Sequence, residues 1–280
     1  MDLRRLKTIS IFVLVALNIM FWAVLNSAQN YEREEQRVMT ESLTKLLSKD
    51  MIYLPQKLEI PDTPDIYGFY LEKMFGDNID LVEKFLGREW QQSENGTFTS
   101  KNGKLRLDGN EFKFYNKDQS QDVTDFSEEN IEKICRDEMK RLGILSDLYV
   151  FSGMNFLDEG IKAIFTAKHE DAVFFDAYIS FDVDGHGIKL VTGKNMVSDL
   201  AVTHSETKFF SITSILPDLP QNPALKKGVA HTIVSITPGY YIGKTDESYR
   251  NILAIPVWQI ATDSGKILYY DARNGQGIEE

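Results

Sequence analysis

The stretch Ile161–Val183, IKAIFTAKHEDAVFFDAYISFDV, decides the fold class of this chain. Apolar residues take every second position in two runs, from Ile161 to Ala167 and from Val173 to Val183. A period of two is typical of strands that bury one face. Asp184-Gly185 then turns the chain into another apolar run at Ile188–Thr192. We therefore expect consecutive strands of an antiparallel meander.

A helix is predicted immediately before this meander. Ser127 is a favoured N-terminal cap, and Gly143 is a favoured stop. Lys140 and Arg141 suit the last turn, because a helix C-terminus carries partial negative charge. The single cysteine, Cys135, lies on the apolar stripe, so we expect a buried small hydrophobe rather than a reactive thiol. That stripe consists of Ile131, Ile134, Cys135 and Leu142.

The same order of elements recurs towards the C-terminus. A short helical stretch is expected at about 208–216, and Asp263-Ser264-Gly265 is the last turn. Pro256 falls inside a strand pattern, which implies an edge or a bulge. We interpret residues 126–200 and 201–280 as two related units, each a helix with an antiparallel sheet. The strands of the second unit are expected near Val229–Thr237, Ile252–Ala261 and Lys266–Ala272.

The segment 30–125 is predicted to hold a juxtamembrane helix and a smaller α+β portion. Prolines at 55, 61 and 64 interrupt regular structure, and Asp80–Leu86 indicates a second helix. Glycines beside Asn or Asp mark tight turns at 96, 103 and 109. The predicted class is therefore α+β, with antiparallel sheets that carry packed helices. The expected apolar stripe of the first helix is Val38, Leu43, Leu46 and Leu47.

Residues 1–29 are predicted to form a cytoplasmic tip and one transmembrane helix. Ile9–Leu25, ISIFVLVALNIMFWAVL, has no charge, and with its flanks it reaches the length that spans a bilayer. Arg4, Arg5 and Lys7 precede it, which places the N-terminus in the cytoplasm and the rest of the chain outside. A cleaved signal peptide is the alternative, but cuts after Ser27 or Ala28 place Leu25 or Asn26 at the third position before the cut, where cleavage requires a small residue.

Composition narrows the range of partners. The 280 residues are 42% hydrophobic and 26% charged, as in an ordinary globular protein, and the formal net charge is -11. An acidic surface repels phosphate backbones, so nucleic acid is not an expected partner.

Two short motifs suggest catalysis but lack the residues that complete it. Ser42-Leu43-Thr44-Lys45 and Ser205-Glu206-Thr207-Lys208 match the S-x-x-K motif of acylating serine enzymes. Such enzymes also use S-D-N and K-T-G motifs. Ser198-Asp199-Leu200 lacks the amide, and Lys244-Thr245-Asp246 lacks the glycine. We expect no enzyme and no catalytic residues.

No metal or cofactor site is expected either. The segment from Asp182 to His186 looks like a calcium loop, but its glycine comes too early and the bidentate Glu is missing. A hairpin turn explains it better. No glycine-rich phosphate loop is present. The histidines show no metal spacing; they are His169, His186, His204 and His231.

At both ends the chain resembles the YycI (WalI) family. The resemblance rests on Met1-Asp2, on Lys7-Thr8-Ile9 running into the apolar helix, and on the tail Ile255–Ile260 followed by Gly265 and Tyr269–Ala272. The tail also resembles PepSY-type modules, in which a helix lies on an antiparallel sheet. YycI proteins are accessory regulators of the WalK/WalR (YycG/YycF) two-component system, which controls cell-wall homeostasis in Gram-positive bacteria.

The resemblance implies a regulatory protein of the cell membrane that binds a WalK-type sensor histidine kinase together with a YycH-type partner. The helix face that bears Asn18, Phe21 and Trp22 is the expected contact within the membrane, because a lone amide there favours a neighbouring helix. The alternative is an extracytoplasmic PepSY-like module that binds a ligand or restrains a protease.

Overall fold

A computed structural model of the chain provides the structure. No helix built from the described residues is long and apolar enough to cross a membrane. Arg4, Arg5, Lys7 and much of the expected span 9–25 lie outside those residues. The structure describes residues 14–15, 17–22, 24, 27, 37–55, 57–58, 60–61, 63, 68–73, 78–93, 96–117, 122–144, 147–203, 209–243 and 251–278.

The chain forms two compact units. The first unit comprises residues 1–58 and 216–233, and the second comprises 59–215 and 234–280. The strands expected within residues 126–200 and those expected within residues 201–280 belong to one strand order.

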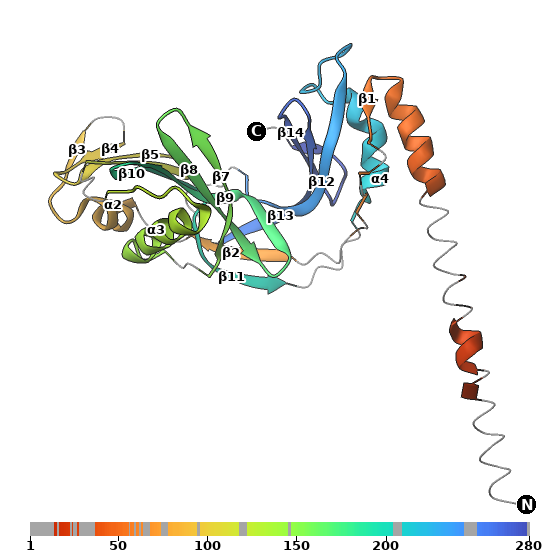
Figure 1. Cartoon of the computed structure of the whole chain (residues 1–280), viewed down its shortest axis with the longest axis horizontal. Helices are drawn as coiled ribbons and strands as arrows, with labels where there is room; N and C mark the ends of the chain where they lie inside the picture. The colour runs from red at the N-terminus through yellow and green to blue at the C-terminus, as the bar shows by residue number, and fades with distance from the viewer. Residues whose placement is uncertain are drawn as a thin grey trace, which may run out of the picture. The chain divides into compact units, whose positions relative to one another are not determined.

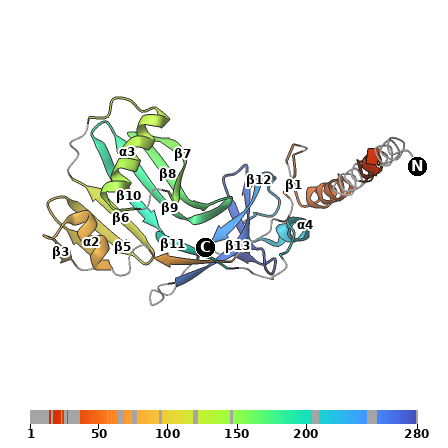
Figure 2. The ribbon, with the colours of Figure 1, turned by 90° about the horizontal axis from the view of Figure 1, so that it is seen from below.

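That order is β11-β2-β13-β12-β9-β10-β6-β5-β4-β3. Off this path, β14 pairs with β13 and β15 with β14, while β8 pairs with β9 and β7 with β8. Most neighbours are antiparallel, as expected, but β12 meets β9 in parallel, with Tyr240 opposite Phe174. Figures 1 and 2 show the long strands β8, β9 and β10 running through the second unit. The strands are β1 Ile52–Tyr53, β2 Gly68–Lys73, β3 Gln91–Ser93, β4 Thr97–Thr99, β5 Gly103–Asp108, β6 Glu111–Asn116, β7 Tyr149–Leu157, β8 Gly160–His169, β9 Ala172–Asp184, β10 Gly187–Lys194, β11 Val197–Thr203, β12 His231–Tyr241, β13 Asn251–Thr262, β14 Ile267–Asp271 and β15 Gly277–Ile278.

Two helices cover one face of the meander. Helix α2, Asn78–Leu86, places Phe85 against Phe112 and Phe114 of β6, with ring centroids 5.0 and 4.9 Å apart. Helix α3, Glu128–Arg141, places the guanidinium of Arg136 over the ring of Phe165 in β8, 5.5 Å from its centroid. The strand registers put these aromatic residues on one face, so both helices lie on the same side of the sheet.

The ends of α3 follow the prediction, with one correction. Gly143 has φ of +70° and stops the helix as expected. Ser127 is the N-terminal cap residue, but its hydroxyl donates to Asp125 Oδ2 at 2.9 Å instead of accepting from the helix. Cys135 is fully buried, as predicted, and burial raises the pKa of its thiol to about 12. Met139 is also fully buried, whereas Ile134 is only half-buried.

The C-terminal strands are tied to the short helix α4, Ile212–Ile215, through its N-terminal flank. Trp258 Nε1 donates to the carbonyl oxygen of Phe210 at 2.9 Å, and Phe210 N–H donates to Ala272 O at 2.7 Å. Pro256 lies where β13 changes partner: its pairing with β2 ends at Ala254, and its pairing with β14 begins at Val257. Proline is tolerated there because it interrupts neither register.

The first unit contains a helix at 37–48, strand β1, the start of β12 and the 3-10 helix η1, Leu216–Gln221. Strand β1 pairs in parallel with β12, with Ile52 opposite His231. Of the expected apolar stripe on the helix, Leu43 and Leu47 are buried, whereas Val38 and Leu46 are exposed. Leu43 and Leu47 are one turn apart, so they face the same side of the helix. Val38 and Leu46 do not share that side.

Candidate functional site: the open face of the meander

The face of the meander opposite α2 and α3 carries three cross-strand rows. These rows follow directly from the period of two, because each helix-facing residue is flanked by residues of the other face. The first row joins Tyr115, Leu190, Asp182 and Lys162; the second joins Lys113, Thr192, Ser180 and Ile164; the third joins Glu111, Lys194, Tyr178 and Thr166. We call this surface the open face.

A hollow of about 560 Å³ lies on the open face. Its centre coincides with the second row, where Thr192 and Ser180 are short and buried, at 9% and 4% exposure. Longer side chains from the flanking rows surround them, including Tyr115 and Tyr178. The hollow therefore results from small hydroxyl residues of two strands that the register places side by side. Its volume is within the range of small-molecule sites.

The charges around the hollow are largely compensated. Lys113 Nζ lies 2.9 Å from Glu111 Oε1, and Lys162 Nζ lies 3.5 Å from Asp182 Oδ1. The hydrogen bond that the Lys113 ammonium donates to Glu111, together with the negative charge of Glu111, raises the pKa of Lys113, so that this ammonium stays charged. Such a site presents hydrogen-bonding groups and aromatic rings without a strong net charge, which favours a polar, uncharged ligand.

One end of the hollow is aromatic because β9 is irregular there. The pairing of β9 with β8 passes from Tyr178 opposite Thr166 to Val173 opposite Lys168, which leaves four residues of β9 unpaired in that ladder. Phe175 consequently lines the hollow. Its ring lies 5.8 Å from that of Tyr269, which lies 5.0 Å from that of Tyr241. Alternation alone predicted a core position for Phe175, and nothing in the local sequence signals the irregularity.

The same irregular segment holds a buried polar network centred on Asp176. Its carboxylate accepts hydrogen bonds from the N–H groups of Ile242 and Gly243 and from Asn195 Nδ2, each at 2.8 Å. Burial raises the pKa of Asp176, and the backbone donors oppose that rise. Asp176 thus connects β9 to the end of β12 and to the turn before β11, which fixes the aromatic end of the hollow.

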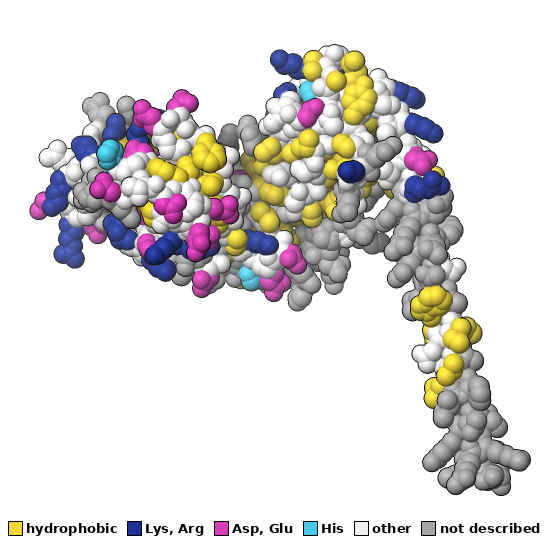
Figure 3. All heavy atoms as spheres, viewed as in Figure 1, with side chains coloured by type: hydrophobic (Ala, Val, Ile, Leu, Met, Phe, Trp, Pro, Cys, Tyr) yellow, Lys and Arg dark blue, Asp and Glu magenta, His cyan; other side chains and the backbone are white. Residues whose placement is uncertain are grey.

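The residues predicted to contact partners in the membrane lie elsewhere in the chain. Asn18 is helical, and its Nδ2 donates to Leu14 O at 2.9 Å within the same helix. Phe21 and Trp22 are exposed, at 60% and 69%. Figure 3 shows exposed apolar side chains along the described residues near the N-terminus. These residues belong to the first unit, whereas the open face belongs to the second, and their role in binding stays a prediction.

The other sequence motifs have local structural explanations. Asp184 Oδ1 accepts from His186 N–H at 2.8 Å in the turn between β9 and β10, which confirms the hairpin. Ser42 is exposed, and its hydroxyl donates to Val38 O at 2.8 Å. The second S-x-x-K motif, Ser205–Lys208, lies outside the described residues. Within the part of the chain that the structure describes, no group of three His, Cys, Asp or Glu residues could hold a metal ion.

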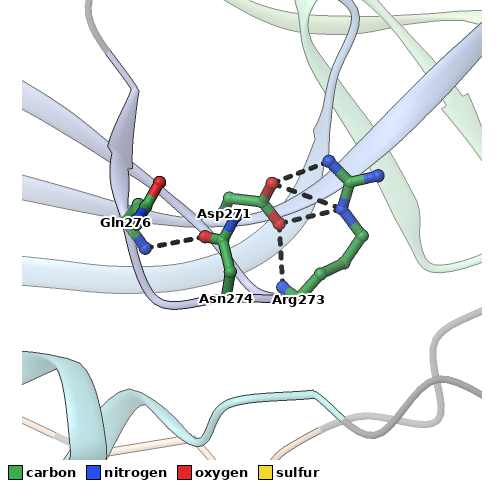
Figure 4. A network of polar contacts seen from close by, with 4 residues as sticks. All are labelled: Asp271, Arg273, Asn274 and Gln276. Carbon is green, nitrogen blue, oxygen red and sulfur yellow. Dashed lines mark hydrogen bonds and ion pairs between the residues drawn. The ribbon is translucent and has the colours of Figure 1, made fainter.

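Asp271, one of the tail residues that carry the family resemblance, anchors a turn. Asp271 accepts from the guanidinium of Arg273 at 2.7 and 3.0 Å and from Arg273 N–H at 2.8 Å. Asn274 Oδ1 then accepts from Gln276 N–H at 2.8 Å (Figure 4). These contacts stabilise the connection between β14 and β15, so this part of the pattern has a structural role.

No family model matches the sequence, and no curated protein matches it. Among solved structures, an uncharacterized protein from Eubacterium rectale ATCC 33656 aligns with a TM-score of 0.52 at 12% identity, over 82% of this chain and 91% of that one. The Bacillus megaterium YpeB C-terminal domain aligns with a TM-score of 0.37 at 9% identity, over 75% of this chain and 100% of that one. The first likeness shows a shared fold, and the second is too distant to carry an argument.

Proposed function

We propose that this chain is an extracytoplasmic binding module, held at the membrane by its N-terminal helix, and that its open face recognises a polar, uncharged ligand. The observation that carries the proposal is the two-sidedness of the sheet: helices close one face, while the other holds a hollow of about 560 Å³. Hydroxyls and internally paired charges suit the polar groups of such a ligand, and aromatic rings suit its apolar faces. A short, uncharged glycan fragment of the cell wall has this chemistry.

The test blocks the hollow without changing the core. Ile164 is half-buried on the open face, so Ile164→Trp should fill the hollow. Lys189→Trp adds the same ring at an exposed position of β10 that does not line it. Ligand-observed NMR with a fractionated cell-wall digest should show binding to the wild type and to Lys189→Trp, and at least tenfold weaker binding to Ile164→Trp. Equal binding by all three proteins, or by none, would refute the proposal.

A second candidate function is regulation of a sensor histidine kinase together with a YycH-type partner. It rests on the sequence resemblance and on the exposure of Phe21 and Trp22, which leaves apolar rings of the N-terminal helical residues available for contact. A partner can shift a two-state kinase only if it binds one state better. In this version the open face is the ligand sensor of the kinase complex, or holds the partner's outer domain.

Co-purification in mild detergent tests this candidate. The native chain is compared with one in which residues 9–25 are replaced by an unrelated apolar helix. Recovery of a kinase with the native chain alone places the contact in the membrane, and recovery with both places it in the outer domain. Recovery with neither would remove the kinase candidate. A kinase assay on Asn18→Leu then tests the amide, and unchanged activity would exclude Asn18 from the contact.

A further inference from the structure

A second hollow, of about 260 Å³, lies within the first unit, far along the chain from the residues of the open face. It forms where the end of the helix at 37–48 meets the turn between η1 and β12. Six of its lining residues matter for its chemistry: Lys49, Asp50, Lys226, Lys227, Gly228 and His231.

His231 is the unusual member of this set. It is only 3% exposed, and its main-chain N–H donates to Met51 O at 2.9 Å, which fixes the residue beside β1. Both ring nitrogens are buried, and neither has a hydrogen-bond partner among the described residues. A buried donor or acceptor without a partner costs about 1–3 kcal/mol, and such groups often mark functional sites. Neither ring nitrogen of His231 has a hydrogen-bond partner among the described residues. Something other than these residues must therefore supply one.

The charge around the hollow is opposite to that of the protein. The chain has a net charge of -11, yet three lysines and one aspartate line this hollow. The ammonium groups of Lys49, Lys226 and Lys227 are on exposed side chains, and within the described part of the chain none forms an ion pair. Concentrated positive charge beside a buried imidazole is suited to an anion that has several acceptor oxygens.

We propose that this hollow binds a phosphate group. The three ammonium groups would neutralise its charge, and an N–H of the His231 ring would donate to one of its oxygens. Phosphate fits better than carboxylate because a free phosphate or a phosphomonoester has at least three terminal oxygens and nearly twice the negative charge, which suits three ammonium groups and an imidazole together. Since protein atoms cover both ring nitrogens, the imidazole must turn towards the hollow when the ligand enters. The ring of His231 is therefore a direct reporter of binding.

The experiment observes that ring in the full chain, purified in a phosphate-free, uncharged detergent. The chain has four histidines, so ¹⁵N-histidine labelling gives four imidazole signals, and His231→Gln assigns the relevant one. Inorganic phosphate is titrated at constant ionic strength. The His231 signal should shift and saturate at roughly millimolar phosphate, while the other three stay unchanged. A matched acetate titration should leave His231 unshifted.

Substitutions at the rim provide the second readout. The double variant Lys226→Gln/Lys227→Gln should weaken the response at least tenfold, whereas Lys101→Gln/Lys104→Gln, at exposed lysines of the second unit, should not. An unshifted His231, an equal response to acetate, or an undiminished response in the rim variant would each overturn the proposal. If inorganic phosphate binds, vesicles that contain phosphatidic acid, whose headgroup is a phosphomonoester, then identify the source. A larger shift with vesicles indicates a lipid headgroup, and a shift with inorganic phosphate alone indicates a soluble phosphate compound.

Discussion

Replacing Asp176 should destabilise the second unit more than any other single polar substitution near the open face. The carboxylate is 4% exposed and accepts three hydrogen bonds of 2.8 Å, two of them from the backbone N–H groups of Ile242 and Gly243. Asp176→Ala leaves both N–H groups buried without an acceptor. Each buried donor without an acceptor costs about 1–3 kcal/mol, so the free energy of unfolding should fall by roughly 4 kcal/mol. Local rearrangement would reduce this loss.

Asp176→Asn is the matched variant, because it keeps the shape and one acceptor oxygen. The side-chain NH2 group of the introduced Asn faces donors that the carboxylate accepted from, so we expect the free energy of unfolding to fall by about 2 kcal/mol. Urea unfolding of the full chain in detergent, followed by circular dichroism, gives both values. A loss below about 1 kcal/mol for Asp176→Ala, with an unchanged dependence on urea, would show that the network contributes little to stability.

The pH dependence of the same pair adds an independent check. Burial raises the pKa of Asp176 above its ordinary value of 3.8, so the folded state binds this proton more tightly than the unfolded state. The stabilisation from this group is complete below pH 3.8 and is lost as pH rises through the folded pKa. The difference in the free energy of unfolding between the wild type and Asp176→Asn should therefore become smaller as the pH rises from about 4 towards 7. A gap that widens would contradict the assigned direction.

Three further predictions concern the core. Burial raises the pKa of the Cys135 thiol from 9.0 to about 12. The free energy of unfolding should therefore fall by about 1.4 kcal/mol per pH unit as the pH rises through that range. In Cys135→Ala, the free energy of unfolding measured with urea should depend less on pH between about 9 and 11. A Cβ at Gly193 would clash with the ring of Phe112, so Gly193→Ala should lower the free energy of unfolding by about 1–3 kcal/mol. Gly185→Ala is the control, because the nearest atom to its Cβ would be 3.9 Å away, and it should change the free energy of unfolding little. Equal losses of stability in the two variants would refute the close packing at Gly193. Trp258→Phe removes a 2.9 Å hydrogen bond from a fully buried indole and should lower the thermal midpoint by several degrees; an unchanged midpoint would remove that bond from the account.

Which face of each meander strand is buried could be read from residue order alone. Alternation from Ile161 onward placed Ala163 and Phe165 in the core, because side chains of a strand point to opposite faces in turn. The stop at Gly143 and the hairpin at Asp184-Gly185 were also predictable, since both depend on local backbone chemistry. The membrane anchor is likewise a prediction from the sequence.

The positions of the two hollows, in contrast, depend on contacts between distant segments. The first depends on register, because Ser180 and Thr192 belong to different strands and meet only when β9 and β10 pair as they do. Its aromatic end depends on the irregular segment of β9 that places Phe175 there, beside the parallel contact with β12. The burial of His231 follows from pairing with Ile52, which is far away in the sequence. A pattern of residue types encodes periodicity along one segment, but the pairing of distant segments is set by the packing of the whole unit.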